Sequence, residues 1–239
     1  MQDRLPIGHP DFRYSASRNP YWAKLREERL PVHSDGETEA HRGEWRSLFP
    51  RGKAGGRRRE LHVEIGCNAG HVVLEWAARD PRSCYIGLDW KFKMIHKGAE
   101  KARKRELGNL LFLRAHADRL KYMFAPEEVD ALYLFFPDPW PKKAQRKNRF
   151  LNADRLRDIH GVLRKGGLFH IKTDHPDYFE AMEEAIAETA PLWDARDRTT
   201  DLHGGNPEAH KLAIPDVTLF EKLFIQDGKP IHSVKLYAL

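Results

Sequence analysis

From Leu61 onward, short apolar runs alternate with segments whose apolar residues recur at helical spacing. The apolar runs cover 61–66, 83–90, 110–118, 129–140 and 168–174. The segments with helical spacing cover 71–80, 93–107, 153–167 and 176–189, and glycines stand at the end of the third. Apolar runs bounded by turn residues predict buried strands, and a period near 3.6 predicts amphipathic helices. The alternation is typical of a parallel sheet with helices on both faces.

The C-terminal segment 217–239 has a different pattern, with two apolar stretches on either side of Asp227 and Gly228. An Asp-Gly pair between apolar stretches is typical of a β-hairpin turn. The fold class predicted from the whole pattern is therefore α/β: a doubly wound, mostly parallel sheet with a C-terminal antiparallel hairpin.

The N-terminal quarter of the chain lacks this alternation. Five prolines, at positions 6, 10, 20, 31 and 50, interrupt any long helix, although 20–30 could form a short one. The glycine- and arginine-rich stretch 50–60 is typical of a linker. We therefore expect residues 1–56 to form an irregular arm and linker, and residues 57–239 to form the domain.

Composition narrows the class of protein. Charged residues make up 32% of the 239 residues and hydrophobic residues 41%, and no apolar run is long enough to span a bilayer. The first 20 residues lack the layout of a signal peptide. The two cysteines form no C-x-x-C pair and the 13 histidines are scattered, so we expect neither a metal site nor a disulfide framework. These features favour a cytoplasmic protein.

The basic residues cluster in three places. The formal net charge is +6 and the isoelectric point is about 9.3, which suggests a polyanionic partner. The first cluster, 57–59, could equally be a charged linker or a contact surface, and the second, 97–105, is interpreted as a solvated helix face. The third, 142–149, contains five cations in eight residues and directly follows a predicted strand.

An acid stands at or just after the carboxyl end of each predicted parallel strand. These acids are Glu64, Asp89, Asp118, Asp138 and Asp174. One such acid could be an ordinary turn residue. Five on one edge would repel one another unless they met donors or cations, and ligands of open α/β sheets bind beyond this edge. The pattern therefore predicts a ligand site there.

The turn after the first strand reads EIGCNAGH, in which Gly66 and Gly70 let the backbone approach a ligand. It matches neither the G-x-G-x-x-G fingerprint nor a P-loop. An acid at the turn favours a cationic ligand, such as S-adenosylmethionine. Asp89 is then spaced to accept hydrogen bonds from the ribose diol and Asp118 to meet the adenine amine. Cys67 is interpreted as a small buried residue.

Six motifs together resemble the bacterial tRNA (guanine-N(7)-)-methyltransferases. They are VEIGCNAGH, YIGLDW, the AD pair at Asp118, LFFPDPWPKKAQRKNR, HIKTD and TLFEKLF, in order between Leu61 and Leu239. The resemblance implies a class I methyltransferase of Rossmann-like fold. It also implies S-adenosylmethionine as cofactor and a guanosine in the variable loop of tRNA as substrate.

The resemblance implies a role for each matching position. Expected cofactor contacts are Glu64, Gly66, Asp89, Asp118 and Asp138, of which Asp138 also resembles the catalytic position. Expected substrate contacts are Lys142, Asp174, Thr218 and Glu221. Expected RNA contacts are Lys143, Arg146, Lys147 and Arg149. Three departures from the family pattern are Asn68, which replaces a glycine, Asp89, which replaces a glutamate, and the basic loop KKAQRKNR, which is less dense in cations than the family pattern. Asn enters the left-handed region more easily than most residues, so we expect the turn to be kept.

The chemistry fits such residues. Guanine N7 carries no proton at neutral pH, so methyl transfer needs alignment and stabilisation of the developing positive charge, which Asp138 could provide. Asp174 and Glu221 could accept from guanine N1–H and N2, and Lys142 could donate to O6 or a phosphate. Trp140 could stack on a base, close the cofactor pocket or pack on the arm.

Two other functions stay open from the residues. One is a methyltransferase acting on an exocyclic amine or a protein side chain, although such enzymes often carry a Pro-Pro aromatic motif where this chain has PDPW. The other is an RNA-binding module without catalysis, which the Asn68 departure would permit.

Overall fold

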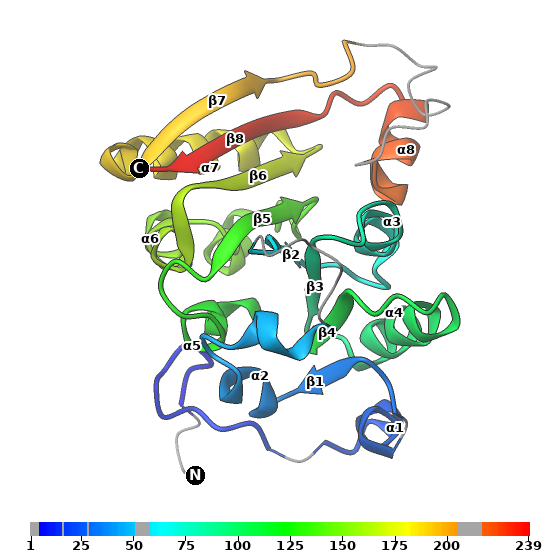
Figure 1. The fold of residues 1–239 in the computed structure, drawn as a ribbon. Coiled ribbons are helices and arrows are strands. Elements are labelled where there is room, and N and C mark those ends of the chain that lie inside the picture. The colour runs from blue at the N-terminus through cyan, green and yellow to red at the C-terminus, as the bar shows by residue number, and fades with distance from the viewer. Residues whose placement is uncertain (1–4, 16, 28, 51–57, 205–216) are drawn as a thin grey trace.

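One mixed sheet organises the molecule. The computed structural model describes residues 5–15, 17–27, 29–50, 58–204 and 217–239, and within them eight strands lie in the order β1-β4-β3-β2-β5-β6-β8-β7 (Figure 1). The strands are β1 (Val32–Ser34), β2 (Leu61–Ile65), β3 (Cys84–Asp89), β4 (Leu110–Arg114), β5 (Val129–Phe135), β6 (Leu163–Thr173), β7 (Trp193–Thr199) and β8 (His232–Ala238). β1 to β6 pair in parallel, and β8 pairs antiparallel with β6 and β7. The α/β fold class is confirmed.

Helices cover both faces of this sheet. α3 (His71–Arg79), α4 (Phe92–Lys104) and α8 (Leu219–Gln226) lie on one side, and α5 (Leu120–Met123), α6 (Ala153–Val162) and α7 (Pro176–Glu188) on the other (Figure 1). Two shorter helices are α1 (Pro20–Glu27) and α2 (Glu37–Ala40), and four 3-10 turns are η1 (Trp45–Leu48), η2 (Ala117–Arg119), η3 (Lys143–Asn148) and η4 (Ala190–Leu192).

Two apolar cores result from strand alternation. Successive strand residues point to opposite faces, so Ile86 and Leu88 of β3 belong to the core under α6 and α7. Tyr85 of the same strand belongs to the core under α3 and α4, together with Phe112 of β4. Because the sheet is buried on both faces, its central strands are almost continuously apolar, which is why they were visible in the sequence.

The chain reverses its direction across the sheet next to β2. It moves outward from β2 to β3 and β4, and then returns to pair β5 with the other side of β2. In such sheets the crevice at the reversal is the usual ligand position. The residues that follow β2 and β5 at their carboxyl ends are therefore the first place to look for a site.

The N-terminal arm extends the sheet. β1 pairs in parallel with β4, with Val32 opposite Phe112. The expected short helix is present as α1. Arg119 is buried and donates to the carbonyl oxygens of Ile7 and His9, at 2.8 Å each, which fixes the arm against η2. The pattern of the arm gave no sign of a strand, and the expected boundary at 56 and 57 lies outside the described residues.

The local structure differs from the sequence prediction in three places. The C-terminal hairpin was expected within 217–239, but its first half is the helix α8, and the antiparallel partner of β8 is β7. The strand β7 was not recognised because its sequence is WDARDRT and only Trp193 is buried, as is common at a charged sheet edge. In addition, α6 ends at Val162 without a glycine stop, and β6 begins at the next residue.

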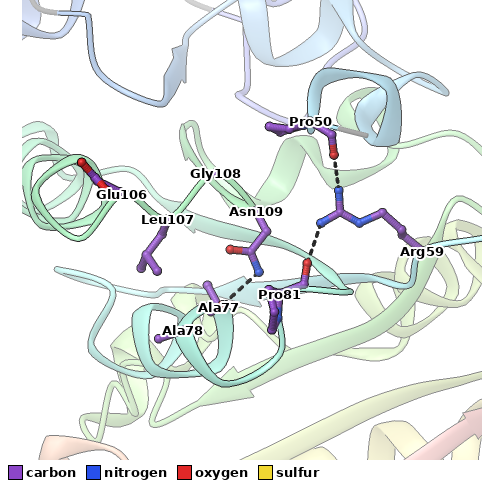
Figure 2. A pocket seen from close by; sticks show the side chains of 9 residues that line it. All are labelled: Pro50, Arg59, Ala77, Ala78, Pro81, Glu106, Leu107, Gly108 and Asn109. Carbon is purple, nitrogen blue, oxygen red and sulfur yellow. Dashed lines mark hydrogen bonds between the residues drawn. The ribbon is translucent and has the colours of Figure 1, made fainter. Parts of the chain in front are cut away.

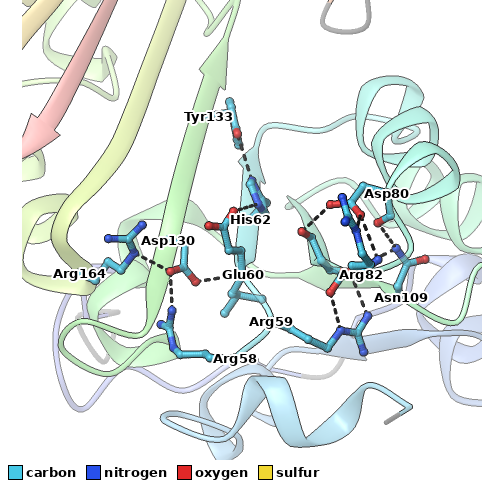
Figure 3. Close-up of polar contacts among 12 residues, drawn as sticks. Arg58, Arg59, Glu60, His62, Asp80, Arg82, Asn109, Asp130, Tyr133 and Arg164 are labelled. Carbon is cyan, nitrogen blue, oxygen red and sulfur yellow. Dashed lines mark hydrogen bonds and ion pairs between the residues drawn. The ribbon is translucent and has the colours of Figure 1, made fainter. Parts of the chain in front are cut away.

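The basic cluster at 57–59 has a structural role where it is described. Asp130 is buried at the amino end of β5 and accepts from Arg46 at 2.5 Å, Arg58 at 2.6 Å and Arg164 at 2.6 Å. Figure 3 shows two of these arginines on Asp130. Arg59 donates to four carbonyl oxygens, including that of Pro50 at 2.7 Å. Position 57 lies outside the described residues.

A depression of about 270 Å³ lies at this amino edge (Figure 2). Alanines 77 and 78, prolines 50 and 81 and the 106–109 turn line it. Two of its polar side chains are already engaged, since Arg59 donates to the Pro50 carbonyl and Asn109 donates to the Ala77 carbonyl at 3.0 Å. These hydrogen bonds occupy the Arg59 and Asn109 side chains. The depression also lies on the edge of the sheet opposite to the strand-end acids.

Candidate functional site

The carboxyl edge of the sheet brings the five strand-end acids together in one row. Because β4, β3, β2, β5 and β6 are neighbours and parallel, their acids follow the same order. Along this edge they run Asp118, Asp89, Glu64, Asp138 and Asp174. The reversal of chain direction falls between β2 and β5, so Glu64 and Asp138 lie on its two sides.

The turn after β2 is a left-handed, open backbone segment. Gly66 has φ +75°, Asn68 +52° and Gly70 +70°. The expectation that Asn68 holds the position of a glycine is confirmed by its φ angle. A Cβ on Gly66 would meet no atom within 4 Å, whereas a Cβ on Gly70 would lie 2.6 Å from the Phe112 ring. Gly66 thus faces open space, and Gly70 allows α3 to pack closely on the sheet.

Asp89 ties this turn to the end of β3. Its Oδ2 accepts from the Asn68 amide at 2.9 Å and its Oδ1 accepts from the Lys91 amide at 2.8 Å. The side chain is buried. A carboxylate has about four acceptor positions, so one on each oxygen stays available. Asp89 can therefore fix the turn and still accept from a diol.

Glu64 is a buried carboxyl at the N-terminus of α3. Its Oε2 accepts from the Val73 amide at 3.3 Å. The pKa of Glu64 is raised to about 8, chiefly by burial and also by the nearby Asp89 carboxylate, while the Val73 amide opposes the shift. A buried carboxyl with a raised pKa is stabilised in its charged form when a cation arrives. Glu64 is thus arranged to meet a positively charged ligand.

Asp118 lies in η2, beside the arm. Its Oδ1 is 2.9 Å from Arg155 Nη2, and its Oδ2 is 3.4 Å from His116 Nδ1. The His116 amide donates to the hydroxyl of Tyr14 at 3.2 Å, so the arm reaches the same turn. Burial lowers the pKa of His116. The Asp118 side chain is about one quarter exposed, which leaves access for an amine.

Asp138 lies in a constrained loop beyond β5. Phe136 and Trp140 have φ angles of +53° and +42°, values that bulky residues rarely adopt. The prolines on both sides of Asp138 fix their own φ, and Pro139 also restricts Asp138. The Phe136 amide donates to the Lys172 carbonyl at 2.8 Å. Asp138 itself is exposed and has no hydrogen bond or ion pair within the described residues.

Trp140 follows in the same loop and is half-buried. None of the ring or cation–π contacts within the described residues involves its indole. Of its three expected roles, stacking on a base and closing the cofactor pocket stay open as predictions, and no described hydrogen bond ties it to the arm.

The basic segment divides into exposed and buried members. Lys142 and η3 residues Lys143, Arg146 and Lys147 are exposed. Arg149 is 8% exposed, and its guanidinium donates to the carbonyl oxygens of Pro139 at 2.8 Å and Asp177 at 3.1 Å. The prediction that Arg149 contacts RNA therefore needs correction, because its side chain is buried and two of its three nitrogens donate to the protein backbone.

The expected substrate residues are also divided. Asp174 follows β6 directly, is half-buried, and has no hydrogen bond or ion pair within the described residues. Thr218 and Glu221 form a capping box at the start of α8, in which the Thr218 hydroxyl accepts from the Glu221 amide at 2.9 Å. The spacing T-x-x-E is the sequence signal of this cap, and it could have revealed the helix.

Glu221 is fully buried and its acceptor positions are filled. Lys172 Nζ lies 3.3 and 3.2 Å from its two oxygens, His203 Nε2 lies 2.8 Å from Oε1, and the Thr218 amide donates to Oε2 at 3.3 Å. Four contacts use the four acceptor positions of a carboxylate. The expectation that Glu221 accepts from guanine is therefore corrected: the side chain fixes α8 to the end of β6.

Lys172 and His203 are the participants that the sequence did not identify. Lys172 belongs to the KTD motif, but a lysine beside a strand end is usually exposed, and nothing local shows its partner. His203 is 31 residues further along the chain, and pairs with Glu221 only through the fold. In the described part of the chain, no group of three His, Cys, Asp or Glu side chains could hold a metal ion. No helix there is long and apolar enough to cross a membrane.

The chain is similar to known proteins over most of its length. Residues 58–234 match the family described as "Putative methyltransferase". A tRNA (guanine-N(7)-)-methyltransferase of Lachnoclostridium phytofermentans is 33% identical over 196 residues, 82% of this chain and 86% of that protein. One of Bacillus cytotoxicus is 33% identical over 200 residues, 84% of this chain and 86% of that protein.

Solved structures share the fold. The 16S rRNA methyltransferase KamB superposes with a TM-score of 0.58 at 19% identity, covering 82% of this chain and 93% of that one. An antibiotic-related methyltransferase superposes with a TM-score of 0.57 at 18% identity, covering 82% and 92%. At these identities the likeness establishes the architecture alone.

Proposed function

This chain belongs to the tRNA (guanine-N(7)-)-methyltransferase family, and we propose on that premise that it methylates N7 of a guanosine in tRNA, in the variable loop. The methyl donor is S-adenosylmethionine. The observation that carries the proposal is the carboxyl edge itself: a left-handed turn with buried acids on one side of the chain reversal, and Asp138 followed by exposed cations on the other.

The residues around the turn fit the cofactor. Gly66 faces open space in the turn between β2 and α3, Glu64 is a buried carboxyl suited to a cation, and Asp89 keeps an acceptor position free on each oxygen for a diol. Asp118 would take the adenine amine with the exposed part of its carboxylate. When bound, S-adenosylmethionine supplies a methyl group activated by a sulfonium charge.

Asp138 is assigned the catalytic role. Guanine N7 has no proton to remove, so the enzyme must align N7 with the methyl group and accommodate the positive charge that develops on the purine. An exposed carboxylate on a loop fixed by two prolines can hold a negative charge next to that purine. Because no described ion pair neutralises Asp138, its full charge is available to the substrate.

Recognition of guanine falls to the groups that the fold leaves free. Phe135 pairs with Lys172 across β5 and β6, so Asp138 and Asp174 leave adjacent strand ends at a similar level. Asp174 can accept from N1–H and N2, and Lys142 can donate to O6 or a phosphate. Thr218 and Glu221 take part by holding α8 beside these groups.

The exposed cations of η3 bind the phosphate backbone. Lys143, Arg146 and Lys147 lie directly after the Asp138 loop, so a tRNA that reaches them places its bases near the carboxyl edge. This interaction is largely electrostatic and weakens with salt. Action on tRNA fits a cytoplasmic enzyme.

The decisive experiment uses the full chain, an unmodified tRNA transcript and S-adenosylmethionine labelled in its methyl group. Borohydride followed by aniline cleaves RNA at N7-methylguanosine, so the expected result is one cleavage in the variable loop. A matched transcript with adenosine at that position should resist cleavage. Label at an exocyclic amine or in protein, without cleavage, would contradict the proposal. Absence of any transfer would favour an RNA-binding module without catalysis.

A further inference from the structure

We propose that Arg149 is a positioning residue that holds the Asp138 loop against the start of α7. This inference rests on the proposed function only in assigning catalysis to Asp138. It replaces the expected role of Arg149 as an RNA contact with a role inside the protein, and it links the two carboxylates that flank the guanine.

The contacts of the guanidinium run between two loops. Arg149 Nε donates to the Pro139 carbonyl at 2.8 Å, one residue after Asp138. Arg149 Nη1 donates to the Asp177 carbonyl at 3.1 Å, three residues after Asp174. The planar fork of arginine gives these two donors a fixed separation and direction. One side chain therefore sets the position of the loop after β5 relative to the segment after β6.

The ring of Tyr178 supports the guanidinium from one side. The Arg149 carbon Cζ lies 4.8 Å from the ring centroid, and the Tyr178 hydroxyl accepts from the Leu151 amide at 3.0 Å. Tyr178 is fully buried and lies in α7. Arg149 is thus enclosed between a rigid helix and the loop, with few other orientations open to it.

The Asp138 loop has few other means of being held. It covers residues 136–142, between β5 and η3, and three of these residues are prolines, at 137, 139 and 141, which have no amide hydrogen to donate. Phe136 and Trp140 have positive φ angles that cost energy unless the surroundings enforce them. The described backbone hydrogen bond to the loop is that of Phe136 to Lys172, before Asp138. Arg149 supplies the hydrogen bond after Asp138, so the acid is fixed on both sides.

One nitrogen of the fork is left over. Arg149 Nη2 is buried and has no hydrogen-bond partner among the described residues. An unpaired buried donor is unfavourable, and such groups persist where function requires the geometry. The exposed cations of the same segment have no such environment, which separates Arg149 from Lys143 and Lys147.

The test compares Arg149→Ala, Arg149→Lys and the control Arg157→Ala. Arg157 is an exposed arginine of α6 that pairs with Asp154 and Glu188, away from the site. Single-turnover kcat, KM for tRNA, its salt dependence and the melting temperature are measured for each full-length protein. Hydrogen exchange of the Phe136 amide, followed by NMR without substrate, reports the anchoring of the loop independently of activity.

We expect Arg149→Ala to lower kcat by about 10- to 100-fold, because a displacement near 1 Å can cost that much. The KM for tRNA and its salt slope should stay near the wild-type values, and the Phe136 amide should exchange faster. Arg149→Lys should recover part of kcat, because it keeps one donor. Arg157→Ala should match the wild type throughout.

Three results would overturn the proposal. A raised KM with a smaller salt slope and normal kcat would make Arg149 an RNA contact. A lower melting temperature with normal kcat would make its role one of stability alone. An unchanged hydrogen-exchange rate of the Phe136 amide in Arg149→Ala would show that Arg149 does not anchor the loop. If the wild-type protein methylates no guanosine, the proposed function fails, and the anchoring is decided by the exchange measurement.

Discussion

The two sides of the carboxyl edge hold their carboxylates differently. On the cofactor side, Glu64 and Asp89 are buried and accept hydrogen bonds from backbone amides. On the substrate side, Asp138 is exposed and Asp174 is half-buried, and within the described residues neither has a hydrogen bond or ion pair. The buried carboxylates on the cofactor side are already held by hydrogen bonds before a ligand arrives. The carboxylates on the substrate side gain their partners from the ligand.

This difference matches the size of the two ligands. A small cationic cofactor gains most from groups that are already oriented and shielded from water, because low local polarity strengthens the attraction. A large RNA brings its own charges and must enter and leave, so its contacts are exposed and sensitive to salt. Glu221 is an exception to this difference, because it lies on the substrate side but is buried and fully paired.

The largest expected effect is on stability, at Glu221. Glu221→Gln removes the charge that compensates buried Lys172, and breaking a buried pair costs about 3–5 kcal/mol of unfolding free energy. Urea denaturation measures it. The control Glu188→Gln removes an exposed partner of Arg157 and should cost less than about 1 kcal/mol. A stable Glu221→Gln protein that binds tRNA poorly would return Glu221 to direct recognition.

At Asp138 we expect a loss of rate without loss of structure. Asp138→Asn should lower single-turnover kcat by about 100- to 1,000-fold, the range seen when one stabilising group is removed from a charged transition state. The melting temperature should stay within the error of the wild type, because the side chain is exposed. Asp154→Asn on α6 is the matched control. Near-normal turnover of Asp138→Asn would contradict the catalytic assignment.

Glu64 tests whether the buried side recognises charge. Glu64→Gln keeps the shape and the hydrogen bond from Val73 but loses the negative charge, so the dissociation constant of S-adenosylmethionine should rise about 10- to 100-fold. Calorimetry measures this directly. In the wild type, affinity should increase as pH rises toward 8 and a proton should be released on binding. Equal affinity of the two proteins at pH 8 would exclude a charge contact.

The same carboxyl gives stability a pH dependence without ligand. Burial raises the pKa of Glu64 to about 8 from an ordinary value of 4.5, so the folded protein keeps a proton that the unfolded chain has lost. The free energy of unfolding therefore falls as the pH rises from about 4.5 to about 8, and it levels off at higher pH. Between pH 7 and 9, Glu64 should contribute a loss of about 1–2 kcal/mol relative to Glu64→Gln. Parallel curves for the two proteins would contradict this.

The smallest effect concerns the exposed cations. Removing Lys143 and Lys147 together should reduce the slope of log affinity for tRNA against log salt by about 1–2, with little change in cofactor affinity. Filter binding at several salt concentrations measures the slope. The control replaces Lys101 and Arg103 of α4 by alanine, since both are exposed on a helix interpreted as solvated. If the control changes the salt slope as much as the loss of Lys143 and Lys147 does, the RNA does not bind specifically at η3.

Much of the site was predictable because parallel strands share a direction. Once the strands were recognised, the acids at or after their ends had to lie on one edge, and the structure places Asp118, Asp89, Glu64, Asp138 and Asp174 there. The backbone of Asn68 was predictable as well, since few residues other than glycine can adopt its φ angle. What failed was local periodicity at the C-terminus, where the Thr218–Glu221 cap competes with an apolar pattern that resembles a strand.

The sequence by itself determined the fold class, the family and the edge on which the chemistry lies, because these depend on local pattern and strand order. The tertiary structure alone decided which charged side chains are free. Arg149 and Lys147 are equivalent cations in the sequence, but Tyr178 and the Asp177 carbonyl, from a helix far along the chain, enclose only the first. The Glu221 carboxylate is likewise paired with Lys172 and His203. Burial depends on distant packing partners, and sequence spacing does not encode them.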